Sequence, residues 1–485
     1  GRSRMPDVEG LIARHAPWAG RDHQWRLTPF EQFMWLDDRA DYPLVFEVVL
    51  RFAGRIDPLA MTDAWRFALA RHPLLRATIA DNAGGPTWIA PARGWRGLDV
   101  VDAASSTSSD LAPFDLERES GLRGVLRETA DGHDLALHFH HACCDGHGAR
   151  MFLQDLVLAY VVLRGASDDD DPFFRCDAAL LDDRSDHAVA GGRKVPLWRR
   201  FWHPLRFALL RPAPATSDLP AATTTRPRTP AGAALGQRTH TFSADEVAGM
   251  DAIQQRYAST RNDIAIAMLF DVLADWQRRH GRPERSRLRV AVPTDLRGRA
   301  DERMPAANRY TYIFLGRALS ECHGWESLLT GLQRDFQQRR QEGRGGQFLD
   351  ILRRAAPHRA LMRWFLRRRS CFSTAVITNL SDPSWRLRKR LPVDADGLMW
   401  LDGARCLDIE IRTPPPRPGT RWGIGIFEYA GRMTISFRYD SSAISSAAAD
   451  EIMARYVNLW RSLLATAERP RAPAVEPTVA FSQTS

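Results

Sequence analysis

The sequence predicts a mixed α/β protein built from two domains. Its 485 residues exceed what one ordinary hydrophobic core holds, so two domains of about 200 residues each are expected. Hydrophobic residues make up 44% and charged residues 26% of the chain, which is the composition of a globular protein. Stretches with helical periodicity alternate with short runs of β-branched and aromatic residues, a pattern that is typical of layered α/β domains.

The first half opens with a well-marked helix start. Thr28 is a suitable N-cap for a helix over residues 28–38, with Pro29 at the first helical position and Glu31 at the third. Residues 57–72 have apolar side chains at the i, i+3, i+4 spacing and predict a second helix. The other elements expected here are strands at residues 44–52, 73–79 and 133–141 and a helix at residues 147–164.

A second series of helices and strands starts near residue 240. Ser243 is expected to cap a helix over residues 244–258, and Glu246 completes a capping box. The next helix is expected to be capped by Asn262 or Asp263. The remaining elements predicted here are helices at residues 264–280, 322–340 and 445–467 and strands at residues 288–292, 308–315, 374–379, 409–411, 422–429 and 433–439.

The domain organisation follows from a change in composition in the middle of the chain. Residues 212–233 are rich in Pro, Ala and Thr, which is typical of a crossover or linker. We therefore expect an N-terminal domain at residues 1–165, a crossover linker at 166–235, a C-terminal domain at 236–468 and a frayed tail at 469–485.

The net charge of +9 limits the classes of partner. Arginine supplies most of the charge, and this reflects either a base composition rich in GC or an attraction to an acidic partner, an anionic lipid surface or nucleic acid. Nucleic acid is not expected, because no Cys/His finger or RNP-type aromatic motif is present.

Residues 193–211 and 353–369 mix arginine with aromatic residues. The first segment is either an amphipathic helix docked on a domain or a surface element that touches lipid or an acidic carrier.

The expected location is cytoplasmic, with peripheral membrane contact as an open alternative. No apolar run approaches the roughly 20 residues that span a bilayer, and the first residues lack the pattern of a secretory signal. The six cysteines are scattered without a CxxC pair, which is typical of free thiols in a reducing compartment.

The most informative stretch is HHACCDG at residues 140–146. Adjacent strand residues point to opposite faces, so only one of His140 and His141 can face a given cavity, and we expect it to be His141. A histidine at the end of a strand is well placed to act as a general base. Asp145 does not have the spacing of a simple relay to His141, so a salt bridge to an arginine elsewhere is expected. Gly146 is expected to let the backbone turn sharply.

Two other interpretations of this motif compete with catalysis. A closed zinc site normally needs a second ligand pair further along the chain, and none is present, so no metal is expected. A buried structural cluster is the other interpretation, because a histidine on an apolar strand is commonly a core residue. The two adjacent histidines with a fitting Asp-Gly favour a functional site over that interpretation.

The motif resembles the His-His, three residues, Asp-Gly signature of the chloramphenicol acetyltransferase-like superfamily. This superfamily includes peptide condensation domains, plant BAHD and polyketide-associated acyltransferases, and wax ester synthase/diacylglycerol acyltransferases. The plant Asp-Phe-Gly-Trp-Gly motif is absent, and Asp382 stands where the family's Ser-Asn-x-x-Gly-Pro strand has glycine. The companion segments that resemble the family are LTPFEQFMW (27–35), HPLLRATI (72–79), RNDIAIAML (261–269), VPTDLRGR (292–299) with Asn308, and TNLSDP (378–383).

The resemblance implies two α/β sandwich domains with a tunnel between them. It makes His141 the general base in mid-tunnel, His140 a structural residue and Asp145 the partner of an arginine, for which Arg297 is the candidate. Asn308 and Asn379 are expected to line the tunnel. Cys143 and Cys144 are treated as packing residues, because the family has variable residues there.

The activity implied is transfer of an acyl group from a thioester to an alcohol or an amine, forming an ester or an amide in natural-product or lipid biosynthesis. The donor is acyl-CoA or a phosphopantetheine-linked acyl group on an acyl or peptidyl carrier protein, so no permanently bound cofactor is expected. A monomer is expected. The alternative is a catalytically degenerate member that acts as a docking or scaffold protein on a carrier protein or a membrane.

Overall fold

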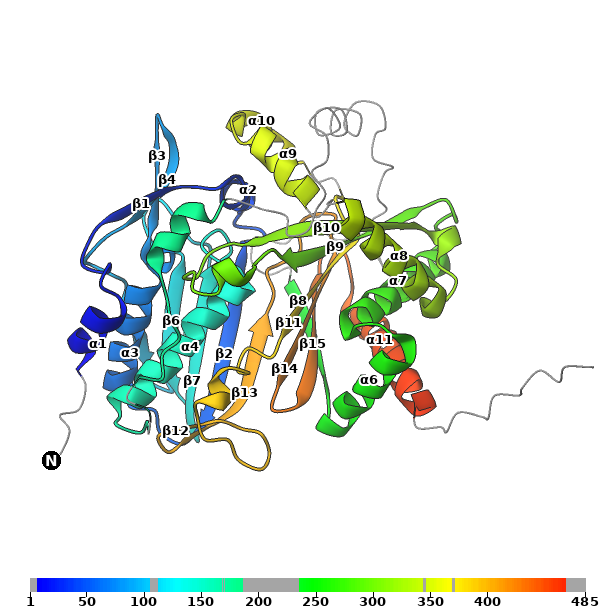
Figure 1. The fold of residues 1–485 in the computed structure, drawn as a ribbon. Helices are drawn as coiled ribbons and strands as arrows, with labels where there is room; N and C mark the ends of the chain where they lie inside the picture. Colours follow the sequence, from blue (N-terminus) through cyan, green and yellow to red (C-terminus); the bar gives the residue numbers. More distant parts are fainter. Residues whose placement is uncertain are drawn as a thin grey trace, which may run out of the picture.

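The computed structural model describes residues 7–104, 112–167, 169, 171–185, 235–342, 346–368 and 371–467. The basic aromatic segment at residues 193–211, the Pro-, Ala- and Thr-rich stretch at 212–233 and the tail at 469–485 lie outside the described residues. Figure 1 shows two large sheets in the middle of the molecule, with a layer of helices outside each of them.

The first sheet has six strands in the order β12-β13-β2-β7-β6-β5. Neighbouring strands are antiparallel except for β5 and β6, which are parallel. Helices α1, α3 and α4 lie on its outer side (Figure 1). The bounds are β2 Val45–Ala53, β5 Asp99–Val101, β6 Leu122–Glu128, β7 Gly132–His140, β12 Trp400–Leu401, β13 Ala404–Arg412, α1 Val8–His15, α3 Pro58–Arg71 and α4 Gly146–Leu163.

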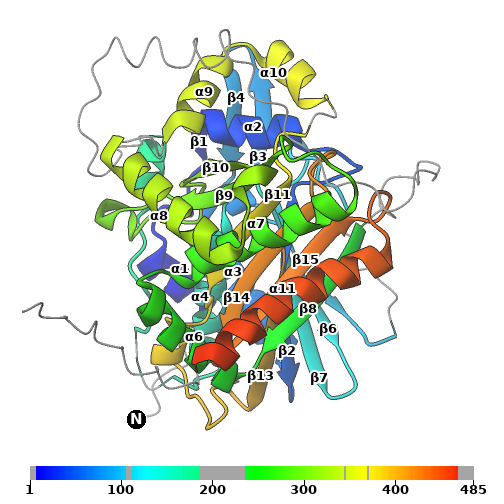
Figure 2. The same ribbon diagram turned by 90° about the vertical axis from the view of Figure 1, so that its right-hand side faces the viewer.

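The second sheet also has six strands, in the order β10-β9-β11-β14-β15-β8. Strand β11 is parallel to both of its neighbours, and the other pairs are antiparallel. Helices α6, α7, α8 and α11 cover this sheet (Figure 2). The bounds are β8 Leu235–Phe242, β9 Arg287–Asp295, β10 Tyr310–Ala318, β11 Ala375–Ser381, β14 Trp422–Tyr429, β15 Arg432–Asp440, α6 Ala244–Tyr257, α7 Arg261–Arg279, α8 Trp325–Glu342 and α11 Ser446–Ala467.

Three further helices and a small sheet complete the described fold. The three-stranded sheet β1-β4-β3 stands beside helix α2, which in turn packs against the helix pair α9–α10 (Figure 1). The bounds are β1 His23–Arg26, β3 Thr78–Asn82, β4 Gly85–Ala90, α2 Pro29–Asp37, α9 Gln347–Ala355 and α10 Arg359–Leu366.

Local sequence explains why β7 and α4 form the frame of the motif. In β7 the alternating residues Leu135, Leu137 and Phe139 are fully buried on one face, as the period-2 pattern predicts. Helix α4 begins directly after the motif, and its side chains from Met151 to Val162 are buried all round. A strand followed by a deeply buried helix gives the intervening turn two rigid ends.

The two halves of the chain interlock. Strand β13 comes from the second half of the sequence but pairs with β2 along its length in the first sheet. In return, the loop at residues 296–309 between β9 and β10 reaches the first half, where the backbone N–H of Ala306 donates to Nδ1 of His72 at 2.9 Å. The Nε2 of His72 lies 2.9 Å from Oδ2 of Asp155 on α4, so the loop is anchored to the helix that follows the motif.

The α/β fold and most of the predicted elements are confirmed. Both capping boxes are present, at Thr28 with Glu31 and at Ser243 with Glu246. Helix α7 begins one turn earlier than predicted, because the side chain of Thr260 caps it by accepting from the backbone of Asp263. The return to strand predicted for residues 73–79 is wrong in its first part, since Pro73–Arg76 form a 3-10 turn before β3.

Part of the expected linker is packed against the first half. The guanidinium of Arg184 forms a buried ion pair with Glu31 at 2.8 Å, and Nε1 of Trp25 donates to Asp182 at 2.8 Å. No helix in the described part of the chain is both long and apolar enough to cross a membrane.

Candidate active site

The histidine motif lies where the first sheet meets the loop donated by the second half. Strand β7 ends at His140, the next residues form a turn, and α4 starts at Gly146 with Asp145 as its N-cap. The loop at residues 296–309 closes over this turn, and Figure 1 shows it beside α4. The motif is therefore at the junction of the two halves.

His141 combines an uncharged ring with a fixed backbone. Its ring is half-buried and packs in a tilted arrangement against the rings of Phe46 and Tyr310. The centroids of these two rings lie 5.1 and 5.4 Å from the centroid of the imidazole. Burial lowers the pKa of His141 from 6.5 to about 4, which outweighs the opposing effects of its own backbone carbonyl and of Asp145. The imidazole is therefore neutral at pH 7 and able to accept a proton.

The backbone of His141 is held on both sides. Its N–H donates to the carbonyl of Leu44 at 2.7 Å, and its carbonyl accepts from Nδ2 of Asn308 at 2.9 Å. The same amide also donates to the carbonyl of Ala142 at 2.8 Å. Asn308, expected to line a tunnel, thus braces the backbone of the motif, while its Oδ1 is buried and has no hydrogen-bond partner among the described residues.

His140 points the other way and holds the turn. Its side chain is fully buried, and Nδ1 accepts from the backbone N–H of Ala142 at 3.0 Å. Its Nε2 lies 3.4 Å from Oδ2 of Asp38. The ring of His140 thus meets Phe114 and Asp38, whereas the ring of His141 meets Phe46 and Tyr310.

Asp145 joins the two halves through a buried ion pair with Arg297. The guanidinium of Arg297 makes two contacts with the carboxylate, at 2.7 and 3.0 Å, and both side chains are 7% exposed. The carboxylate also accepts from the backbone N–H of Gly148 at 2.8 Å and of Arg309 at 2.9 Å. Burial alone would raise the pKa of Asp145, but the attraction of Arg297 and these hydrogen bonds hold it below its ordinary value. The carboxylate is ionised and fully engaged, so it has no free oxygen for a relay to His141.

Two glycines in this turn are required by close approach. Gly146 does not adopt a positive φ, so the position does not need glycine for its backbone angles. A Cβ at Gly146 would meet the side chain of Leu380 at 2.6 Å. A Cβ at Gly148 would meet Cys144, the backbone N of Ala307 and Cα of Ala306 within about 3 Å. Glycine therefore lets the loop of the second half settle onto the first turn of α4.

The cysteines of the motif are buried, and the histidines on either side of it have structural partners. Cys143 and Cys144 are fully buried, and burial raises the pKa of both thiols well above the ordinary range, so neither is poised as a nucleophile. His138 pairs with Glu47 at 3.0 Å, and His147 lies 2.7 Å from a guanidinium nitrogen of Arg150. Within the described residues, no group of three His, Cys, Asp or Glu side chains is arranged to hold a metal ion.

Tyr310 is a site residue to which no sequence motif points. Its hydroxyl lies 3.3 Å from Nδ1 and 3.5 Å from Nε2 of His141, and 3.5 Å from the hydroxyl of Tyr312. Burial raises the pKa of Tyr310 well above its ordinary value, so the group stays protonated and can donate. The signal was the alternation of aromatic residues after Asn308, which predicts a strand but does not tell which face meets a histidine 169 positions away.

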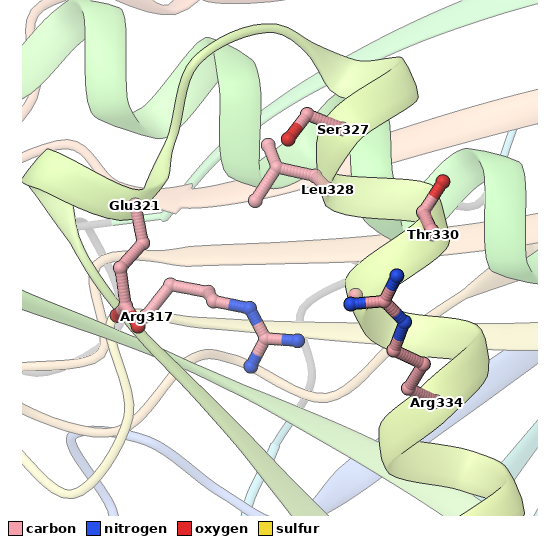
Figure 3. Close-up of a pocket in the computed structure, with 7 residues that line it drawn as sticks. Arg317, Glu321, Ser327, Leu328, Thr330 and Arg334 are labelled. Atoms are coloured by element: carbon pink, nitrogen blue, oxygen red, sulfur yellow. The ribbon is translucent and has the colours of Figure 1, made fainter.

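Asn379 and a surface hollow lie apart from these residues. Asn379 is exposed on β11, and its Oδ1 accepts a hydrogen bond from the backbone N–H of Ser381. In the described part of the chain, Asn379 makes no hydrogen bond with His141. A hollow of about 410 Å³ lies between the end of β10 and helix α8. Figure 3 shows the side chains that line it. Its lining contains no residue of the histidine motif and consists of Arg317, Glu321, Ser327, Leu328, Thr330, Gly331 and Arg334.

The sequence relatives include uncharacterized proteins, peptide synthetases and a dimycocerosyl transferase. An uncharacterized protein of Mycobacterium tuberculosis is 26% identical over 348 residues, covering 67% of this chain and 74% of its own length. Phthiocerol/phthiodiolone dimycocerosyl transferase of the same organism is 28% identical over 128 residues, which are 25% of this chain and 30% of the transferase. No protein-family model matches the chain.

Solved structures resemble nearly the whole chain. The epimerization domain from the third module of tyrocidine synthetase B has a TM-score of 0.64 at 14% identity, covering 92% of this chain and 98% of that domain. The starter condensation domain of rhizomide synthetase, solved with C8-CoA and Leu-SNAC, has a TM-score of 0.59 at 14% identity, covering 92% and 96%.

The buried ion pair at the motif generates a stability prediction. Asp145→Ala leaves the guanidinium of Arg297 buried without its carboxylate, so the free energy of unfolding should fall by about 3–5 kcal/mol in denaturant titrations. The double variant Asp145→Ala/Arg297→Met should recover part of this loss. The control is Asp251→Ala, which removes a 60% exposed partner of Arg261 and should cost about 1 kcal/mol or less. An Asp145→Ala protein of normal stability would contradict the anchoring role.

The likeness to these solved structures over 92% of the chain shows that it has the chloramphenicol acetyltransferase-like fold of condensation and epimerization domains, as the resemblance of its histidine motif predicted.

Proposed function

We propose that the protein transfers an acyl group from a thioester to an alcohol or an amine, with His141 as the general base. The observation that carries the proposal is the position of the His141 imidazole, which is held by its backbone at the junction of the halves and lies beside the hydroxyl of Tyr310. Burial at this position lowers the pKa of the ring, which favours its neutral form. The relationship to a dimycocerosyl transferase and the fold of condensation domains support a condensation-type acyl transfer.

The donor is an acyl-CoA or an acyl group on the phosphopantetheine arm of a carrier protein. The similar starter condensation domain was solved with C8-CoA, which supports a thioester donor. The acceptor approaches as a neutral alcohol or amine. The product is an ester or an amide together with a free thiol.

The reaction needs one base that later acts as an acid. The acceptor oxygen or nitrogen attacks the thioester carbonyl while its proton moves to the imidazole of His141. The tetrahedral intermediate collapses, the carbon–sulfur bond breaks, and the departing sulfur takes the proton from the imidazolium. Holding both substrates beside one ring replaces a bimolecular encounter with an oriented reaction, which supplies much of the rate.

Tyr310 orients the base. Its hydroxyl is close to both ring nitrogens of His141, and it remains a donor because its pKa is raised. A hydrogen bond to one nitrogen fixes which of the two is free to accept the acceptor's proton.

Removal of the imidazole tests the proposal. With a purified acyl-CoA and a panel of alcohols and amines, His141→Ala should lower the rate of thiol release about 10²–10⁴-fold while the fold is kept. The matched control is His323→Ala, which removes an exposed imidazole and should leave the rate unchanged. Full activity of His141→Ala would remove the general-base assignment, and no transfer with any donor by the unmodified chain would favour a docking or scaffold role.

The low pKa of His141 predicts the pH dependence of the reaction. Protonation of the ring removes the base, so kcat/KM should fall as pH drops through the pKa of the free site. Because that pKa is lowered to about 4, the acid limb should lie far below 6.5, and kcat/KM should be flat between about pH 5 and 7. Circular dichroism at each pH separates this limb from acid unfolding. An acid limb at or above pH 6.5 would show that the working base is a different, more solvated group.

Removal of the Tyr310 hydroxyl should lower kcat/KM less than removal of the His141 imidazole does. Tyr310→Phe removes one neutral hydrogen bond to the base, so kcat/KM should fall about fivefold, as expected for roughly 1 kcal/mol. Tyr312→Phe is the matched control, because its hydroxyl lies 3.5 Å from that of Tyr310 but makes no hydrogen bond with His141 in the described chain. Equal kcat/KM values for the two variants would show that Tyr310 does not orient the ring.

A further inference from the structure

Helices α9 and α10 form a hairpin that is buried on one side only. Leu349 and Leu352 of α9 and Met362 and Leu366 of α10 are all less than 7% exposed, and both helices contact α2. Figures 1 and 2 show the pair at one end of the molecule, beyond the ends of the two large sheets. The outer side of the hairpin is therefore a projecting surface.

That outer side carries large apolar side chains. Ile351 is 51%, Leu361 61%, Trp364 55% and Phe365 48% exposed. They are four of the ten large hydrophobic residues that are exposed in the described chain, and they fall within one short hairpin. Single exposed apolar residues are ordinary, but a group of four with two aromatic rings marks an interaction surface.

The same surface is strongly basic. Residues 346–368 contain six arginines and one aspartate, a net charge of +5. Arg353 pairs with Asp350, and Arg359 pairs with Asp81, at 2.9 and 2.5 Å. Arg363 and Arg367 are exposed and have no carboxylate partner among the described residues. Arg368 lies over the ring of Trp364, 3.9 Å from its centroid, so cationic and aromatic groups share one face.

We propose that the α9–α10 hairpin docks the protein on an anionic lipid bilayer. Trp364, Phe365 and Leu361 enter the boundary between headgroups and acyl chains, and the arginines beside them pair with lipid phosphates. The charge favours an anionic surface, and the projecting shape favours a bilayer over a folded partner, because a tip fits into a soft surface while a protein would need a matching groove.

The hairpin also lies at the end of a row of aromatic rings that leads to the candidate base. Phe348 of α9 is 5.7 Å from the ring of Tyr312, which is 5.6 Å from that of Tyr310, and Tyr310 is 5.4 Å from His141. Docking would therefore turn this side of the site toward the membrane, and a consequence that rests on the proposed function is that one substrate is a lipophilic molecule supplied from the bilayer.

Vesicle sedimentation of the full chain tests the docking surface. Vesicles of equal parts phosphatidylcholine and phosphatidylglycerol should bind the protein, and vesicles of phosphatidylcholine alone should bind it far more weakly. Raising the salt from about 0.1 M to 1 M shortens the screening length from about 10 to 3 Å and should release much of the bound protein. Arg363→Glu/Arg367→Glu and Trp364→Ser/Phe365→Ser should each weaken binding about tenfold or more.

The controls change exposed residues elsewhere in the chain. Arg118→Glu and Trp400→Ala replace residues of the same types outside the hairpin and should bind vesicles as the unmodified protein does. Failure to bind the anionic vesicles, or binding that neither hairpin variant weakens, overturns the proposal. A second outcome also overturns the proposal: the unmodified protein does not bind vesicles but binds a purified acidic carrier protein, and the hairpin variants lose that binding. This result would assign the surface to a protein partner. Thiol release from a short acyl-CoA without vesicles should be unchanged in these variants, so a failed docking test leaves the proposed function standing.

Discussion

The carboxylate of Asp145 accepts hydrogen bonds from both halves of the chain. It caps α4 of the first half through Gly148, and it receives the guanidinium of Arg297 and the backbone N–H of Arg309 from the second half. Removing such a charge from water costs several kcal/mol, and only good geometry with all acceptor positions filled offsets that cost. The arrangement therefore tolerates little displacement of the loop at residues 296–309, and this loop also supplies Asn308, whose amide holds the backbone of His141. The position of the candidate base thus depends on an ion pair that does not touch its ring.

The interlocked halves explain why the ion pair between Asp145 and Arg297 affects the position of His141. Strand β13 leaves the second half to join the first sheet, and the β9–β10 loop leaves the second sheet to rest on α4. Each half lends a segment to the other, so the junction is fixed at two separated places. Glycine at positions 146 and 148 allows the backbones to approach closely there. Neither half alone contains both His141 and its brace, Asn308.

Local patterns predicted the elements that depend on neighbours in the sequence, and failed where distant segments decide. The cap at Thr28 and the alternation in β7 need only a few adjacent residues, and both are present in the structure. Spacing excluded Asp145 as a simple relay, while the choice of Arg297 came from the resemblance to a family and not from spacing. The pairing of β13 with β2 and the place of Tyr310 beside His141 join residues more than 160 positions apart, and no local period encodes such a contact.

The ion pair between Asp145 and Arg297 affects the free energy of protonating His141. A pKa of about 4 makes His141 a weaker base than free imidazole, so forming the imidazolium costs more at this place than in water. A free carboxylate beside the ring would lower that cost, but it would also keep the ring protonated before any substrate arrived. Asp145 is already neutralised by Arg297, and its effect on His141 is too small to outweigh burial. The proposed reaction supplies the missing charge at the right moment, because attack on the thioester places negative charge on the carbonyl oxygen close to the ring. The protonated ring is therefore more stable in the transition state, beside this negative charge, than it would be in the site without substrate. Catalysis requires such a preference for the transition state.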